Sequence, residues 1–154
     1  MNSLTPAEAV VSIIAWPAGA RVIDEVALPL RGDEHVVGLR KIVRERAIEL
    51  KLSLVDQTKL VTAASELARN TIKYGGGGDV LLVRLNDGLS NGIGLAFIDQ
   101  GPGIADIAQA LQDGFTSGGG LGLGLGGAKR LVDWFDIAST PGSGTTVATV
   151  KWKR

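Results

Sequence analysis

Two nearby stretches decide the fold of this chain: D-Q-G-P-G-I at Asp99–Ile104, and D-G-F-T-S-G-G-G-L-G-L-G-L-G-G at Asp113–Gly127. Eight of the fifteen residues in the second run are glycine. Because glycine has no Cβ atom, many backbone N–H groups of this run are accessible to a ligand. Such groups bind phosphate, and the residues that follow predict a helix over 127–134 whose N-terminus adds further N–H donors. The stretch therefore predicts a phosphate-binding loop that leads into a helix.

A flexible linker, a dinucleotide-binding loop and a P-loop each fit the glycine run less well. A linker usually contains Ser and other polar residues, whereas here Leu121, Leu123 and Leu125 alternate with glycine and need packing partners. The pattern G-x-G-x-x-G at Gly122–Gly127 is typical of dinucleotide-binding folds, but no strand leads into it and no acidic residue follows about 20 positions later. A P-loop requires lysine where this chain has Ala128.

The composition is that of one globular domain without thiol chemistry. Of the 154 residues, 45% are hydrophobic and 21% are charged. This length and this hydrophobic content are enough for one domain with a hydrophobic core. Sixteen basic residues balance sixteen acidic ones, so we expect neither nucleic acid nor a membrane as a partner. The chain has no cysteine and one histidine, which excludes disulfides and multi-histidine metal sites. No signal-like or membrane-spanning segment is found, so we expect a cytoplasmic protein.

The first part of the chain predicts a strand and an amphipathic helix. Residues 1–20 form an N-terminal segment to which the sequence assigns no role, and residues 21–154 form the predicted domain. Arg21–Leu30 is rich in strand-forming residues, and Pro29 confines its end to a sheet edge. Asp33 is the expected N-cap of a helix of about five turns, in which apolar residues recur at i, i+3 and i+4.

A second helix carries the first candidate functional residues. Ser53 or Asp56 is its expected N-cap, and it runs to Tyr74 before the four glycines of Gly75–Gly78 stop it. One face is an apolar stripe that a core would bury. Three side chains on another face recur at i, i+4 and i+7: Glu66, Asn70 and Lys73.

The second part of the chain predicts strands with two helices between them. Two apolar runs joined by N-D-G-L-S-N-G predict a hairpin, with Asp99 at the end of its second strand. The predicted strands are Val80–Leu85, Ile93–Ile98, Phe135–Ser139 and Thr145–Lys151, and the predicted helices are Ala105–Leu111 and 127–134. This order predicts an α+β fold, a two-layer α/β sandwich whose mixed, mostly antiparallel sheet has helices on one face.

Four sequence boxes, in this order, resemble those of the GHKL ATP-binding family, which includes gyrase B, Hsp90, histidine kinases and MutL. The boxes are E-L-A-R-N at Glu66–Asn70, D-Q-G-P-G at Asp99–Gly103, G-G-L-G-L-G-L at Gly119–Leu125 and G-T-T-V at Gly144–Val147. The resemblance extends from about Asp56 to Lys151. It implies a Bergerat-type sandwich that binds ATP between its helices and a lid.

The resemblance implies three roles on the second helix. Glu66 matches the general base that takes a proton from the attacking hydroxyl or water. Asn70 matches the residue whose amide oxygen binds Mg²⁺, a cation that prefers oxygen ligands beside phosphates. Lys73 matches a position that often contacts phosphate. ATP and Mg²⁺ are therefore the implied cofactors.

The resemblance also implies how the base and the phosphates are held. Asp99 matches the residue that accepts a hydrogen bond from the exocyclic amine of adenine, and Thr145 matches the hydroxyl that supports this contact. Two groups of glycines are implied to line the site, near the base and in the lid: Gly101 and Gly103, and Gly119, Gly120, Gly122 and Gly124.

Features that the chain lacks indicate the branch of the family. Its length leaves no room for the transducer domain of gyrase, Hsp90 or MutL, and its only histidine, His35, lacks the acidic or asparagine follower of a phosphoacceptor histidine. The stretches V-D-Q-T-K-L-V-T-A-A-S-E-L-A-R-N, D-Q-G-P-G-I and G-A-K-R-L-V-D-W-F, with the closing K-W-K-R, resemble RsbT-type switch kinases of the stressosome. The chain differs from these in a longer segment before Arg21 and in the glycines after Tyr74.

This closer resemblance implies a serine/threonine protein kinase of a bacterial partner-switching pathway. The implied partners are STAS-domain scaffold or antagonist proteins, which it phosphorylates, and a PP2C-type phosphatase, which it activates by binding. Two alternatives stay open at this point. One is an anti-sigma factor of the same fold, which binds a sigma factor, and the other is a nucleotide-gated binding module without catalysis, against which the intact Glu66 and Asn70 argue.

Overall fold

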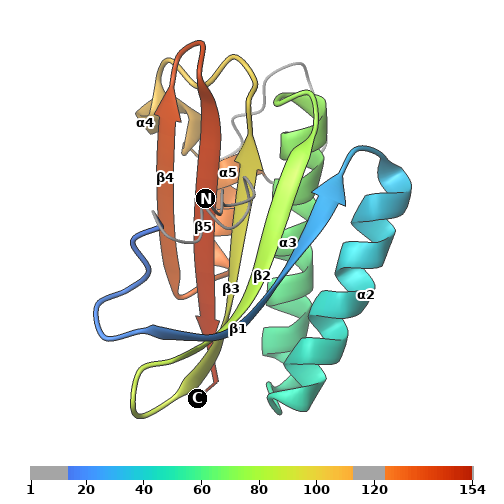
Figure 1. Cartoon of the computed structure of the whole chain (residues 1–154), viewed down its shortest axis with the longest axis vertical. Helices are drawn as coiled ribbons and strands as arrows, with labels where there is room; N and C mark the ends of the chain where they lie inside the picture. Colours follow the sequence, from blue (N-terminus) through green and yellow to red (C-terminus); the bar gives the residue numbers. More distant parts are fainter. Residues whose placement is uncertain (1–13, 113–123, 154) are drawn as a thin grey trace, which may run out of the picture.

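The computed structural model describes residues 14–112 and 124–153, which form one sheet with helices packed on one of its faces (Figure 1). The strands are β1 (Arg21–Leu30), β2 (Gly78–Asn86), β3 (Asn91–Asp99), β4 (Trp134–Thr140) and β5 (Gly144–Trp152). The helices are α2 (Asp33–Glu49), α3 (Leu54–Lys73), α4 (Ile107–Ala110) and α5 (Gly124–Arg130). The predicted α+β sandwich is confirmed.

The strands follow the order β1-β2-β3-β5-β4, and each neighbouring pair is antiparallel. The predicted hairpin joins β2 to β3. Pro29 lies in β1 at the edge of the sheet. Proline has no backbone N–H group to donate, and an edge strand tolerates this because one of its sides has no neighbouring strand. In the middle of the sheet, the pairing of β3 with β5 places Asp99 opposite Thr145.

The start of α2 differs from the prediction that Asp33 is its N-cap. Because β1 extends to Leu30, the chain must turn within two residues, and Gly32 takes the extended N-cap conformation without a side-chain cap. Asp33 is the first helical residue. His35 Nδ1 instead accepts a hydrogen bond of 2.9 Å from the backbone N–H of Arg31, which fixes the turn before the helix.

Helix α3 is close to its prediction. The Ser53 hydroxyl accepts a hydrogen bond of 3.1 Å from the backbone N–H of Asp56, which identifies Ser53 as the N-cap. After the C-cap Tyr74, Gly76 and Gly77 have φ values of 75° and 99°, which end the helix. The expected apolar stripe is buried: Leu60, Ala63, Ala64, Leu67 and Thr71.

The bounds of the helix predicted over 127–134 are wrong at both ends. Helix α5 begins at Gly124 and ends at Arg130. Trp134 belongs to β4 and pairs with β5. The carboxylate of Asp133 accepts hydrogen bonds from the backbone N–H of Trp152 at 2.7 Å and from Lys151 Nζ at 3.3 Å. Because of these contacts with β5, the chain leaves the helix before Asp133. Helix periodicity could not predict them, since their partners lie 18 and 19 residues away in the sequence.

Helix α4 is also shorter than the predicted Ala105–Leu111. Asp106 is its N-cap, since its side chain accepts a hydrogen bond of 2.9 Å from the backbone N–H of Gln109. The cap leaves Ala105 in the loop that follows β3, where it lines the cavity described below.

The outer face of the sheet, which is the face opposite the helices, is apolar as well. Residues from 14 to 20 lie against it, and Trp16 packs on two clusters of buried strand residues. Its ring centroid is 6.1 Å from that of Trp134. Gly94 provides the space, because a Cβ atom there would come within 2.8 Å of the Trp16 ring. Burial on both faces explains why β2 and β3 are continuous apolar runs.

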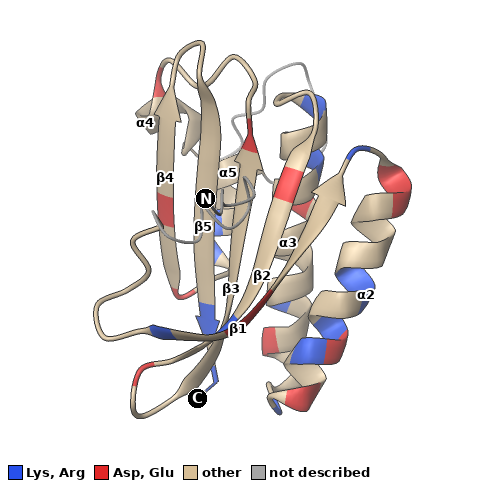
Figure 2. Cartoon of the chain, in the orientation of Figure 1, with Lys and Arg blue, Asp and Glu red and all other residues tan. Residues whose placement is uncertain are grey.

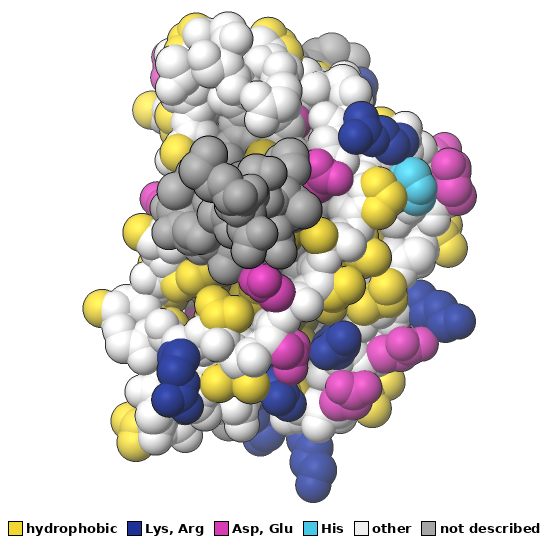
Figure 3. Space-filling view, viewed as in Figure 1, with side chains coloured by type: hydrophobic (Ala, Val, Ile, Leu, Met, Phe, Trp, Pro, Cys, Tyr) yellow, Lys and Arg dark blue, Asp and Glu magenta, His cyan; other side chains and the backbone are white. Residues whose placement is uncertain are grey.

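Charged side chains of both signs follow one another along the exposed side of α2 (Figure 2). The space-filling view shows both signs interspersed with apolar atoms (Figure 3). Among the described helices, none combines the length and the apolar character needed to cross a bilayer.

Candidate nucleotide-binding site

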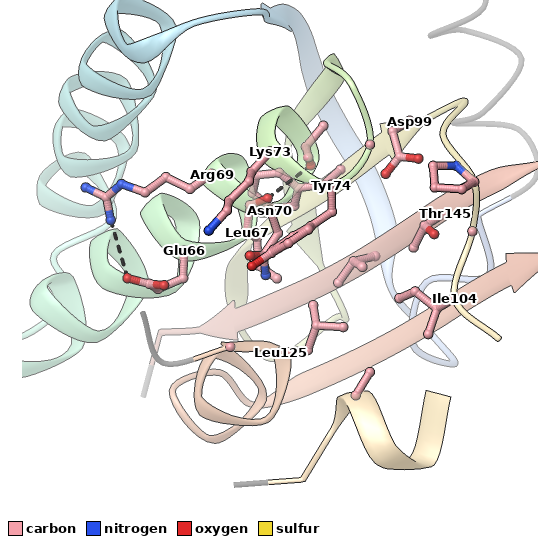
Figure 4. Close-up of a pocket in the computed structure, with 18 of the residues that line it drawn as sticks. Glu66, Leu67, Arg69, Asn70, Lys73, Tyr74, Asp99, Ile104, Leu125 and Thr145 are labelled. Carbon is pink, nitrogen blue, oxygen red and sulfur yellow. Dashed lines mark hydrogen bonds and ion pairs between the residues drawn. The ribbon is translucent and has the colours of Figure 1, made fainter. Parts of the chain in front are cut away.

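A cavity of about 600 Å³ opens between α3, the loop after β3, α4, the start of α5 and β5 (Figure 4). Volumes of roughly 300–1,000 Å³ are usual for small-molecule sites. Its wall is largely apolar, with Phe97 from β3, Val147 from β5 and Leu125 from α5. Polar groups gather at two opposite ends, one formed by α3 and the other by the ends of β3 and β5 (Figure 4).

The α3 end contains the three residues that the sequence placed on one helix face. Glu66, Asn70 and Lys73 all line the cavity, and Arg69 lies beside them. Arg69 Nη1 is 3.3 Å from Glu66 Oε1, an ion pair between residues three positions apart on the helix. The Glu66 side chain is only 14% exposed and that of Arg69 is 54% exposed, so the guanidinium lies on the solvent side of this carboxylate.

Lys73 and Tyr74 form the last part of this helix face. Lys73 Nζ lies 5.2 Å from the centre of the Tyr74 ring, close enough for a cation–π contact. Tyr74 remains 38% exposed and also lines the cavity. The contact keeps a positive charge at the cavity wall, in reach of an anionic ligand.

Asp99 is the main polar group at the opposite end. As the last residue of β3, it leaves the sheet where its carboxylate borders the cavity. Its Oδ1 atom accepts a hydrogen bond of 2.9 Å from the backbone N–H of Gly101, which fixes the side-chain direction. A carboxylate held in this way can accept a hydrogen bond from a ligand amine with its remaining lone pairs.

The glycines near Asp99 are required by close backbone packing. Gly103, which lines the cavity, has a φ of 77°, and a Cβ atom there would strike the carbonyl oxygen of Thr140. A Cβ atom on Gly101 would come within 2.7 Å of the Gly75 Cα atom. The loop after β3 is therefore pressed between the end of α3 and the β4–β5 turn, which fixes the wall near Asp99.

Thr145 lines the cavity beside Asp99, its partner across the β3–β5 ladder. Its Oγ1 atom is 2.8 Å from the hydroxyl of Ser139 on β4. The Ser139 hydroxyl also accepts a hydrogen bond of 2.7 Å from the backbone N–H of Ile104. Two cavity-lining residues, Ile104 and Thr145, are therefore joined through one side chain behind them.

Of the four glycines predicted to form a lid, Gly124 lies within the described residues. Gly124 begins α5 with a φ of 70° and lines the cavity together with Leu125. Gly126 is buried, and a Cβ atom there would strike the carbonyl oxygen of Leu111, so α5 packs closely on the segment after α4. The three other predicted lid residues lie outside the described residues: Gly119, Gly120 and Gly122.

Four neighbours of the site were missed by sequence reasoning. Arg69 could have been found, because it lies at i+3 from Glu66 on the same helix face. Tyr74 and Gly75 appeared only as a helix end and a helix stop. Ser139 left no local signal, because its contacts with the loop after β3 come from a residue 35 positions away.

The donor set fits a magnesium nucleotide better than a metal held by protein alone. Among the described residues, no group of three or more His, Cys, Asp or Glu side chains gathers as a metal cage. Mg²⁺ commonly keeps waters and phosphate oxygens as ligands and takes only one or two oxygens from the protein. The amide oxygen of Asn70, in a cavity large enough for a nucleotide, suits that mode of binding.

Residues 55–154 match the family described as histidine kinase-, DNA gyrase B-, and HSP90-like ATPase. The serine/threonine-protein kinase RsbT of Bacillus subtilis (strain 168) is 40% identical over 131 residues, 85% of this chain and 98% of that relative. The anti-sigma F factor of Thermoanaerobacter sp. (strain X514) is 31% identical over 117 residues, 73% of this chain and 82% of that relative.

A crystal structure of the RsbU and RsbW domains of a Mycobacterium tuberculosis protein has the same fold. The TM-score is 0.59 at 20% identity over 85% of this chain, which spans 33% of that longer chain. The family match covers α3, β3 and β5, the elements that supply the polar groups of the cavity. The chain therefore belongs to the family of histidine kinase-, DNA gyrase B- and HSP90-like ATPases, in its branch of RsbT-type serine/threonine kinases and anti-sigma factors.

Proposed function

We propose that this protein is an ATP-dependent serine/threonine kinase of a partner-switching pathway that phosphorylates STAS-domain proteins. One observation carries the proposal: Glu66 and Asp99 border the same 600 Å³ cavity from opposite ends. A nucleotide whose base lies at Asp99 then has its phosphates near α3, beside Glu66. The similarity to the RsbT kinase supports this activity. We propose that residues 21–154 carry it.

Asp99 and Thr145 select the base in this proposal. The carboxylate accepts a hydrogen bond from an exocyclic amine, which adenine offers at the position where guanine has a carbonyl oxygen. Gly101 holds the carboxylate in place through its backbone N–H. Thr145 lies beside it on β5. A carboxylate facing a carbonyl oxygen would leave two acceptors opposed, so guanine nucleotides should bind weakly.

Glu66 acts as general base at the other end. When bound, Mg²⁺-ATP supplies the γ-phosphoryl group and a divalent charge that offsets the phosphate charges. The Glu66 carboxylate accepts the proton of the Ser or Thr hydroxyl of the protein substrate. That oxygen forms its bond to the γ-phosphorus while the bond to the β,γ-bridging oxygen breaks, which gives phosphoprotein and ADP. Arg69 holds the carboxylate in position through its ion pair.

Asn70 and Lys73 serve the phosphate end of the site. Asn70 would hold Mg²⁺ through its side-chain oxygen, and the ammonium group of Lys73 stabilises phosphate charge. Both side chains line the cavity on the same face of α3 as Glu66. One rigid helix thereby fixes the base relative to the groups that would hold the metal and the phosphates, which suits a transfer step that depends on positioning.

The test is to incubate the full chain with Mg²⁺, γ-labelled ATP and STAS-domain proteins from the same genome. We expect acid-stable label on a Ser or Thr of a STAS protein. Glu66→Gln should slow this transfer roughly 10²–10⁴-fold and leave nucleotide affinity intact, because the amide keeps the shape of the carboxylate but cannot accept the proton.

Asp99→Asn is the contrasting variant: it should reduce nucleotide affinity in calorimetry, whereas Glu66→Gln should reduce only the rate of transfer. Transfer at the parental rate by Glu66→Gln would remove Glu66 as the base. A protein that binds ATP but labels no STAS protein would contradict the kinase proposal.

A second set of partners follows from the same resemblance. We propose that the protein also binds a PP2C-type phosphatase, which pull-down with the purified phosphatase would test. The similarity to anti-sigma F factors favours a sigma factor as the alternative partner. Capture of an RNA polymerase sigma subunit in a nucleotide-dependent manner, without STAS phosphorylation, would favour an anti-sigma factor over a switch kinase.

A further inference from the structure

The Ser139 hydroxyl lies directly behind the end of the cavity where Asp99 and Thr145 meet. Ser139 itself does not line the cavity, but its Oγ atom is within hydrogen-bonding distance of three groups. They are the backbone N–H of Ile104 at 2.7 Å, the hydroxyl of Thr145 at 2.8 Å and the carbonyl oxygen of Gly144 at 3.2 Å. The residue is half-buried on β4.

These contacts restrict where the hydroxyl protons can go. A serine hydroxyl has one proton to donate, and the carbonyl oxygen of Gly144 can only accept it. If Ser139 donates to that carbonyl, its oxygen takes the bonds from Ile104 N–H and from the Thr145 hydroxyl. Each of the three contacts then has a donor and an acceptor. In this arrangement Thr145 turns its proton toward Ser139 and only its lone pairs toward the cavity.

We propose that Ser139 is a positioning residue for base selection, which deepens the proposed function and rests on it. By taking the proton of Thr145, Ser139 makes that hydroxyl an acceptor toward the cavity, in addition to the Asp99 carboxylate. Two neighbouring acceptors fit an exocyclic amine, which has two protons to donate, and reject a carbonyl oxygen. The bond from Ile104 N–H also fastens the cavity-lining loop to β4, so that one side chain sets both the polarity and the shape of this end.

The experiment measures how tightly ATP, GTP and purine riboside triphosphate bind, by calorimetry with the full chain. Purine riboside triphosphate lacks the exocyclic amine and otherwise has the shape of ATP. The parental protein should bind ATP roughly 10-fold or more tightly than this analogue, since a lost partner leaves a buried acceptor unsatisfied. Ser139→Ala should remove most of that ratio by weakening ATP, with a far smaller effect on the analogue.

Three further variants make the test specific. Ser139→Cys is nearly isosteric but a weak hydrogen-bond partner, so it should also lose the ratio even if the alanine variant folds poorly. Ser139→Thr retains the hydroxyl and should restore it. Ser143→Ala, in the exposed turn between β4 and β5, is the matched control and should leave the ratio unchanged.

Equal weakening of ATP and the analogue in both Ser139→Ala and Ser139→Cys would assign Ser139 a purely structural role and overturn the inference. Loss of the ratio in Asp99→Asn, together with an unchanged ratio in Ser139→Ala and Ser139→Cys, would overturn it and leave the proposed function standing. A parental protein that bound ATP and purine riboside triphosphate equally would overturn both this inference and the assignment of Asp99 to the base.

Discussion

Gly75 lies directly against the carboxyl group of Asp99. A Cβ atom added at Gly75 would overlap that carboxyl group, and its nearest neighbours are all atoms of the same side chain. Gly75 therefore allows Asp99 to keep the direction in which it accepts the Gly101 N–H and borders the cavity. The residue after the C-cap of α3 thus controls a side chain at the end of β3.

Gly75→Ala should weaken nucleotide binding by displacing Asp99. We expect a loss of roughly 10- to 100-fold in ATP affinity, the cost of one misplaced charged hydrogen bond, measured by calorimetry. Gly38→Ala is the matched control, because a Cβ atom there meets nothing within 4 Å. On an exposed position of α2 it should leave ATP affinity unchanged and raise stability by about 0.5–1 kcal/mol. Parental affinity in Gly75→Ala would contradict the packing argument.

At the same scale, the residues that sequence could place were those fixed by local geometry. Glu66, Asn70 and Lys73 follow from helix periodicity, and Asp99 follows from the end of an apolar strand. Ser139 and Gly75 act through contacts between elements that are far apart in the chain, so a local pattern could not reveal them.

At the scale of elements, Lys151 joins α3, β5 and the segment between α5 and β4. Its Nζ atom is 3.3 Å from a carboxylate oxygen of Asp56 and 3.3 Å from one of Asp133, and its side chain is only 9% exposed. Asp133 in turn receives the Trp152 N–H. This cluster ends the helical segment before β4, which is why a helix over 127–134 could not be inferred correctly from periodicity alone.

Lys151→Met should destabilise the fold by about 1–3 kcal/mol, because it leaves two carboxylates without their shared cation. The value lies below that of a fully buried pair, since both carboxylates retain some contact with water. Chemical denaturation would measure the change. The exposed Lys59→Met on α3 serves as control and should stay within about 0.5 kcal/mol of the parent. Equal stability of Lys151→Met would show that the cluster contributes nothing.

The β2–β3 hairpin should become less stable in acid. Backbone N–H groups of Leu89 and Ser90 donate to the Asp87 carboxylate and hold its pKa below the usual 3.8. A depressed pKa in the folded state stabilises the fold above the unfolded-state pKa, and the contribution is lost as pH falls through the folded-state pKa. Asp87→Asn should therefore show a shallower loss of melting temperature than the parent between pH 5 and pH 3. Identical slopes would contradict this.

At the scale of the whole molecule, one cavity depends on elements from most of the chain. Its walls come from α3, β3, α4, α5 and β5, so a nucleotide that binds there should stabilise the entire fold. The order and type of these elements could be predicted, because apolar periodicity and turn residues determine them. The start of α2 and both ends of α5 could not, because strand pairing and packing decide where those helices begin and end.

Nucleotide should raise the melting temperature of the protein. With Mg²⁺-ATP at 100 times its dissociation constant, binding adds about 2.7 kcal/mol to stability. For a chain of this size that corresponds to a rise of about 5–10 °C in thermal denaturation. Asp99→Asn at the same ATP concentration should show little of this rise. A full rise in that variant would place the base elsewhere.

The aromatic residues are divided between the two sides of the sheet. All three tryptophans, Trp16, Trp134 and Trp152, pack on the outer face, and the single tyrosine, Tyr74, lines the cavity. Indole fluorescence therefore reports on the docking of the segment around Trp16, because no tryptophan is among the residues that line the cavity. A fluorine label on tyrosine would report on the cavity in a magnetic resonance spectrum with one signal. The chain thus carries separate spectroscopic reporters for the two faces of its sheet.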